Sequence, residues 1–217
     1  MTHEERLEIL SNIETGCVTD AMAYLNTGKW MSGIYPTNSE TKIFGRAVTV
    51  QFEAVENPEA IIDQFQLVDM CKPADVLVWS VPSEGNIIGE NIMHFAENKG
   101  LNGIIIDGYT RDVNIIAGMP IPEFTKGKAI APAPRNMRSR KELINIPVEC
   151  GGITVQPGDY IFGDNDGVLV VPEKDIDRVL AQALLNMDAE KKVETVLNAH
   201  CSLEELKAVI RSKKTIE

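Results

Sequence analysis

The sequence predicts an α/β fold, organised as a single domain over residues 1–217 with N-terminal helices and a C-terminal helical tail. An apolar run at Val76–Val81, a helical pattern at Glu90–Lys99 and a β-branched run at Ile104–Ile106 follow one another. This strand–helix–strand order favours short parallel βαβ units with right-handed crossovers. The length of 217 residues fits one domain with a sizeable core. The 44% hydrophobic and 24% charged fractions are those of a soluble globular protein.

The first quarter of the chain predicts two helices, a loop and a strand. Thr2–Ile13 has apolar residues at helical spacing, and its first residue can form a capping box with Glu5. A second short helix is expected at Val18–Leu25. Glycines and a proline among polar residues indicate a loop at Asn26–Glu40. Alternating apolar residues at Ile43–Glu53 then predict a strand.

The middle of the chain carries the repeated strand and helix signals. After Asn57-Pro58, a helix is expected from Glu59 toward Met70, because proline suits the first helical turn. Gly85 and Gly89 permit a sharp turn before the helix at Glu90–Lys99, and Gly100 ends that helix. Beyond Ile104–Ile106, a short helix or turn is expected at Val113–Ala117 and a short strand at Lys128–Ala131.

The last third predicts short strands followed by helices. Three segments have β character: Ile146–Cys150, Ile153–Val155 and Tyr160–Phe162. Asp164–Gly167 is expected to be a hairpin turn leading into a buried strand. Helical spacing of apolar residues begins at Lys174, and a final amphipathic helix is expected at Ser202–Lys213.

Candidate site residues gather around the central helix. Backbone N–H groups from Gly89 through Glu90 and Asn91 to Ile92 would be unpaired at the helix start, where the dipole favours an anion. Arg111 and Asp112 follow a buried strand, at the end where α/β proteins bind ligands. Arginine offers a planar fork for a carboxylate, and aspartate is a hard oxygen ligand for a divalent cation.

The residues alone leave an alternative open at this point. In that alternative, Glu90 caps its own helix, while Arg111 and Asp112 only punctuate a turn.

Charge and cysteine content exclude several classes of function. The net charge of −11 argues against nucleic acid and anionic membranes as partners. Cys17, Cys71, Cys150 and Cys201 are widely spaced, without a Cys-x-x-Cys pair, which argues against a common zinc site. Reduced thiols, no apolar signal segment and no long apolar run together predict a cytoplasmic protein.

Ordered motifs along most of the chain resemble the RraA-like superfamily. Glu90, twenty intervening residues and then Arg111-Asp112 is similar to its acidic-x20-Arg-Asp signature. Further matching segments are Val18–Met22, Gly45–Thr49, Ile106–Asp112 and Gly163–Pro172. One departure is that the family's aldolases typically have Asp where this chain has Glu90, whose side chain is one methylene longer.

The resemblance implies a fold, an assembly and a reaction. The fold would have the β/β/α layering of swivelling domains, assembled as a homotrimer or homohexamer. The reaction would be cleavage of 4-hydroxy-4-methyl-2-oxoglutarate to pyruvate and a second oxo acid, together with decarboxylation of oxaloacetate. Both reactions pass through the pyruvate enolate, which a divalent cation such as Mg²⁺ or Mn²⁺ stabilises as a Lewis acid.

The resemblance also implies roles for particular residues. Asp112 would bind the metal, Arg111 would bind the substrate and stabilise the enolate, and Glu90 would position water. The amides from Gly89 to Ile92 would bind the substrate carboxylate. An acid of the C-terminal helix, Asp188 or Glu190, would reach the neighbouring subunit's site. The residues alone favour the alternative, in which both are solvated helix residues.

Two other functions stay open at this point. Some members of the superfamily bind and inhibit ribonuclease machinery, a role that does not require the Arg-Asp acid. A metal-dependent lyase or isomerase acting on a different oxo acid or sugar acid is the other alternative, which the glutamate at position 90 leaves open.

Overall fold

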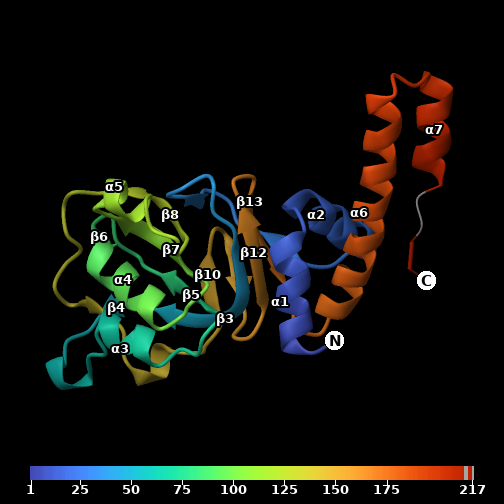
Figure 1. Cartoon of the computed structure of the whole chain (residues 1–217). Coiled ribbons are helices and arrows are strands. Elements are labelled where there is room, and N and C mark those ends of the chain that lie inside the picture. Colours follow the sequence, from blue (N-terminus) through green and yellow to red (C-terminus); the bar gives the residue numbers. More distant parts are fainter. Residues whose placement is uncertain (213–214, 217) are drawn as a thin grey trace. The chain divides into compact units, whose positions relative to one another are not determined.

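The computed structural model describes residues 1–212, 215 and 216, which divide into two compact units (Figure 1). One is a sheet unit, residues 29–173, and the other is a helical unit, residues 1–28 with the chain from Lys174 onward. Each is described by itself.

The sheet unit is built on a mixed β-sheet, which has nine strands within the described residues. Its strands lie in the order β1 (Lys29–Trp30), β13 (Gly167–Val171), β12 (Tyr160–Asp164), β3 (Ile43–Gln51), β5 (Asp75–Ser80), β7 (Gly103–Thr110), β8 (Glu123–Lys128) and β2 (Tyr35–Pro36), and β6 (Asn86–Ile88) also pairs with β7.

The four central strands β3, β5, β7 and β8 are mutually parallel, and the outer strands run antiparallel to their neighbours. Ile104, Ile105 and Ile106 in β7 are fully buried, as expected for a parallel strand covered on both faces. The carboxyl ends of β5 and β7 lie at one edge of the sheet. The predicted α/β class with parallel βαβ units is therefore confirmed.

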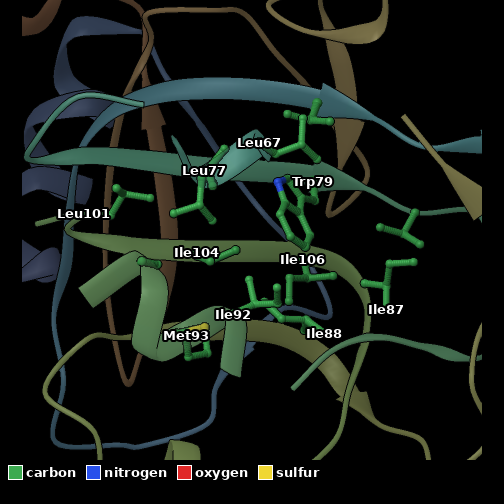
Figure 2. Close-up of a cluster of buried hydrophobic side chains, with 14 of the residues drawn as sticks. Leu67, Leu77, Trp79, Ile87, Ile88, Ile92, Met93, Leu101, Ile104 and Ile106 are labelled. Carbon is green, nitrogen blue, oxygen red and sulfur yellow. The ribbon is translucent and has the colours of Figure 1, made fainter. Parts of the chain in front are cut away.

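Helices cover one face of the sheet and a hairpin covers the other. Helices α3 (Gln64–Asp69) and α4 (Glu90–Asn98) pack on β5 and β7. Figure 2 shows this core, which includes Leu67, Leu77, Trp79, Ile92, Met93, Ile104 and Ile106. On the opposite face, a second cluster joins the sheet to the antiparallel hairpin of β10 (Val148–Cys150) and β11 (Ile153–Val155). The layers thus follow the β/β/α order.

Smaller elements complete the sheet unit. They are β4 (Glu53–Ala54) paired with β9 (Met137–Arg138), the short helix α5 (Val113–Ile116), and the 3₁₀ turns η1 (Pro58–Ala60) and η2 (Lys141–Leu143).

Four local expectations were wrong. The expected loop at residues 26–40 contains β1 and β2, because each pairs with a distant strand. The turn expected from Gly85 contains β6. The helix expected from Glu59 begins only at Gln64, where Asp63 and Gln66 form a capping box. The strand expected at Lys128–Ala131 instead begins at Glu123 and ends at Lys128.

The helical unit contains α1 (His3–Asn12), α2 (Thr15–Leu25), α6 (Ile176–Asn198) and α7 (Leu203–Arg211). The predicted capping box of Thr2 and Glu5 begins α1. Arg6 joins α1 to α6 through Asp177, with 2.7 Å between Nε and Oδ1. Lys213, the predicted end of the last helix, lies outside the described residues. In the part of the chain that is described, no helix combines the length and apolar composition that a bilayer crossing requires.

Candidate functional site

Strand β7 carries Arg111 and Asp112 to the carboxyl edge of the parallel strands. Asp112 has φ 59° and ψ 28°, a left-handed conformation that aspartate tolerates better than most residues. Its backbone carbonyl accepts hydrogen bonds from Ile115 and Ile116, which starts α5. Its side chain makes no capping bond to α5. The carboxylate is therefore left to interact with the other helix at this edge, α4.

Strand β6 places the start of α4 directly beside the Arg-Asp pair. The Arg111 amide donates to the Ile88 carbonyl at 3.2 Å, so β6 and the end of β7 are joined where α4 begins. Asp112 Oδ2 lies 3.4 Å from the Glu90 amide nitrogen and 3.4 Å from Arg111 Nε. The sheet thus brings the helix start and both members of the pair together.

Gly89 makes this approach sterically possible. Its φ of −155° is extended and open to any residue, so the requirement for glycine is one of space. A Cβ added at Gly89 would lie 2.4 Å from Asp112 Oδ2 and 3.1 Å from Arg111 Nε. Any side chain here would displace the carboxylate.

A cavity of about 230 Å³ opens at this corner. Of the predicted site residues, Gly89, Asn91, Ile92, Arg111 and Asp112 line it, whereas Glu90 is not part of its lining. Glu90 contributes its amide to the contact with Asp112. The Ile92 amide was expected to face the substrate, but it donates to the Gly89 carbonyl at 3.2 Å. Because the Glu90 amide faces Asp112, the amides of Gly89 and Asn91 are the ones left for an anion.

The sequence did not indicate five further lining residues: Gln64, Phe65, Asn86, Ile87 and Ile88. The first two come from α3, whose position beside β6 depends on the tertiary fold. Gln64 Nε2 donates to the Ile87 carbonyl at 3.3 Å, which links the two segments. Asn86 is the one with a local signal, as a polar residue next to two isoleucines.

The donor set at Asp112 fits a divalent cation completed by substrate and water. The Asp112 side chain is 33% exposed, and its two polar contacts at 3.4 Å are long. In the described chain, no three His, Cys, Asp or Glu side chains gather closely enough to form a metal cage. Mg²⁺ is commonly held by one or two carboxylates while it keeps several waters. Asp112 could serve as that carboxylate.

The two C-terminal acids lie on α6 in the helical unit. Asp188 is exposed. Glu190 is also exposed, and its Oε2 accepts a hydrogen bond from Cys17 Sγ at 3.0 Å. Burial, together with this glutamate, raises the pKa of Cys17 to about 12. Cys17 is therefore a protonated structural thiol.

Comparison with known proteins decides the family. The profile of the RraA-like family, described as Aldolase/RraA, matches residues 15–170. The chain belongs to the RraA-like family. A relative from Halalkalibacterium halodurans, provisionally named 4-hydroxy-4-methyl-2-oxoglutarate aldolase, is 31% identical over 175 residues, which cover 79% of this chain and 78% of the relative.

Solved structures show the same RraA-like fold. An uncharacterised protein from Pseudomonas syringae pv. tomato superposes with a TM-score of 0.84 at 25% identity, covering 95% of this chain and 94% of that one. RraAS2 from Streptomyces coelicolor, described as an unusual member of the RNase ES inhibitor RraA family, superposes with a TM-score of 0.74 at 23% identity, covering 88% and 96%. The latter likeness concerns the fold alone.

Proposed function

We propose that this RraA-like protein is a divalent-metal-dependent lyase for 2-oxo acids. It would cleave a 4-hydroxy-2-oxo acid of the 4-hydroxy-4-methyl-2-oxoglutarate type and decarboxylate oxaloacetate. One observation carries the proposal: the open carboxylate of Asp112 lies at a cavity, 3.4 Å from the first amide of α4 and beside Arg111. A carboxylate that could bind a cation, backbone amides that could bind an anion, and a guanidinium group therefore meet at one cavity.

Each reaction needs charge stabilisation at the keto oxygen. In retro-aldol cleavage the C3–C4 bond breaks, its electron pair remains on the pyruvate fragment as an enolate, and the C4 hydroxyl loses its proton. In decarboxylation the bond to the departing carboxylate breaks and leaves the same enolate, which then takes a proton at C3. Electrostatic stabilisation of such an oxyanion is commonly the largest catalytic contribution.

Each residue of the candidate site would have a separate role in binding or catalysis. The amides of Gly89 and Asn91 would bind the substrate carboxylate at the positive end of α4, beside the Glu90 amide, which faces Asp112. Arg111 would direct its guanidinium at the keto oxygen, and Glu90 would position water. Asp112 would hold Mg²⁺ or Mn²⁺, which when bound supplies Lewis-acid stabilisation of several kcal/mol.

The proposal includes an assembly. A homotrimer or homohexamer would allow Asp188 or Glu190 of one subunit to approach a neighbour's site. The exposure of both acids on α6 is compatible with that role.

The test measures pyruvate released from oxaloacetate with Mg²⁺ or Mn²⁺, before and after chelation. Asp112→Asn keeps the side-chain volume but removes the charge, so turnover should fall by at least about 100-fold, and Mn²⁺ affinity should fall with it. Asp166→Asn is the matched control, because Asp166 is an exposed acid in the β12–β13 turn.

Two results would count against the lyase. Unchanged turnover in Asp112→Asn would remove the metal-ligand role. No turnover of oxaloacetate or of any 4-hydroxy-2-oxo acid by the intact protein would favour a binding function instead.

A further inference from the structure

A cavity of about 330 Å³ lies in the sheet unit apart from the candidate site. It shares no lining residue with the cavity beside α4. Asp75, the first residue of β5, and Arg46, its neighbour in β3, both line this cavity. It therefore lies toward the amino ends of the parallel strands, whereas the Arg-Asp pair lies at their carboxyl ends.

Backbone hydrogen bonds to β3 hold two sides of this cavity. The Gly158 amide donates to the Ala47 carbonyl at 2.9 Å, and the Asn145 amide donates to the Thr49 carbonyl at 2.8 Å. The end of α3 supplies a third side. Segments that are distant in the sequence thus meet here through the fold itself.

The floor of the cavity is aliphatic. Val50 and Leu67 belong to the buried core of the sheet unit, and Val48 and Ile144 pack against that core. Met70 adds a flexible thioether side chain that is 55% exposed and can adapt to the shape of a ligand. This floor can remove a short hydrocarbon chain from water.

The rim of the cavity carries two cations and one acid: Arg46, Lys72 and Asp75. Asp75 Oδ2 already accepts a hydrogen bond from the Lys72 amide at 2.8 Å. The rim is thus locally positive, although the whole chain has a net charge of −11. A ligand with one negative charge is therefore favoured here over a cation.

Arg46 has hydrogen-bond donors to offer such a ligand. Its Nη2 lies 3.0 Å from Glu173 Oε1, but both side chains are largely exposed, and exposed ion pairs contribute little. Its Nε is buried and has no hydrogen-bond partner among the described residues. Gly158, with φ 86°, leaves space for the guanidinium, because an added Cβ would lie 3.0 Å from Nη2. A carboxylate bound side-on would supply the acceptor that Nε lacks.

We propose that this cavity binds a small monocarboxylate with a short aliphatic chain. The carboxylate would bind the Arg46 guanidinium, and the chain would pack on Val48, Leu67 and Met70. This site does not depend on the proposed function, because Arg111, Asp112 and the start of α4 do not line the cavity.

Hexanoate is the probe that tests the proposal, with affinities measured by isothermal titration calorimetry. Its Kd should be roughly 1 mM, as is reasonable for so small a ligand. Butyrate, which is two methylenes shorter, should bind roughly tenfold more weakly. 1-Hexanol, which lacks the charge, should also bind at least about tenfold more weakly than hexanoate. Equal binding of 1-hexanol and hexanoate would overturn the proposal.

NMR of the full chain with isotope-labelled methionine locates the bound probe. The methyl signal of Met70, identified by its loss in Met70→Leu, should shift saturably with hexanoate. Binding that leaves the Met70 signal unmoved would place the ligand elsewhere and refute the proposed site.

Two variants separate the head of the ligand from its tail. Arg46→Gln should weaken hexanoate binding about tenfold, because it removes the charge that the carboxylate meets. Arg178→Gln is the matched control, since Arg178 is an exposed arginine of α6 outside the lining. Met70→Gln should reduce the tenfold preference for hexanoate over butyrate to about threefold or less, and it decides the question should Arg46→Gln not fold. Unchanged binding in a folded Arg46→Gln protein, or an unchanged preference in Met70→Gln, would contradict the proposal.

Asp112→Asn distinguishes this site from the candidate active site. It should bind hexanoate as tightly as the wild type does. Loss of hexanoate binding in Asp112→Asn would mean that the carboxylate occupies the proposed oxo-acid site, so this proposal would fail while the proposed function stood. If oxaloacetate is not turned over while Met70 responds to hexanoate as expected, the proposed function fails and the monocarboxylate site stands.

Discussion

Gly89→Ala is a steric probe of where the Asp112 carboxylate must be. The added Cβ would lie 2.4 Å from Asp112 Oδ2, whereas ordinary contact begins at 3.4 Å. The carboxylate must therefore retreat by 3.4 − 2.4 = 1.0 Å. Alanine adopts the extended φ of −155° without strain, so the substitution acts on the site rather than on the backbone.

A displacement of this size sets the expected loss of activity. Moving a catalytic group by about 1 Å can cost on the order of 100-fold in rate. That factor corresponds to about 2.7 kcal/mol of transition-state stabilisation. The unfolding free energy should fall by a smaller amount, about 0.5–1 kcal/mol, because alanine is a poorer N-cap than glycine.

The assay compares kcat/KM for oxaloacetate decarboxylation, Mn²⁺ affinity and urea unfolding in the same protein samples. Gly16→Ala is the control, because a Cβ at Gly16 meets no atom within 4 Å. This control should keep full turnover and gain a few tenths of a kcal/mol in stability, since Gly16 lies in α2. A folded Gly89→Ala protein with undiminished turnover would refute the placement of Asp112 at the reacting centre.

Two further predictions concern stability in the sheet unit. Glu123 is 1% exposed and accepts a hydrogen bond from Thr37 Oγ1 at 2.6 Å, and burial raises its pKa to about 7. Because this folded-state pKa lies above the usual glutamate value of 4.5, the unfolding free energy should fall as pH rises from 4.5 to about 7 and should then level off. The unfolding free energy of Glu123→Gln, relative to that of the wild type, should therefore increase by about 2–3 kcal/mol between pH 5 and pH 8. Urea titrations at the two pH values measure this change. A difference that stays constant with pH would contradict the prediction. Ala74 has φ 67°, so Ala74→Gly should raise the unfolding free energy by about 1 kcal/mol, and a lower urea midpoint would show the strain estimate to be wrong.

The local patterns of the sequence were sufficient to predict the strands and the helix at the centre of the sheet unit. The apolar run at Val76–Val81 and the β-branched run at Ile104–Ile106 became the adjacent parallel strands β5 and β7. The helix between them begins at Glu90 as its glycine and apolar spacing indicate. Such patterns succeed because a buried strand and an amphipathic helix each require a fixed apolar period over consecutive residues.

Segments that depend on distant partners were not predictable in the same way. β1 and β2 are two residues each and exist only because β13 and β8 offer free edges. β6, between Gly85 and Gly89, was also not predicted, because it forms by pairing with the end of β7. A strand this short has too few residues to show a period, and its hydrogen-bond partners lie elsewhere in the chain.

The sequence by itself determined the chemical groups of the candidate site: the helix that begins at Glu90, and the Arg111-Asp112 pair at the end of a buried strand. Only the tertiary structure decided their distances and the cavity walls that come from α3 and β6. The physical reason is that residue chemistry and periodicity are local properties, whereas a cavity exists only where segments from several parts of the chain meet.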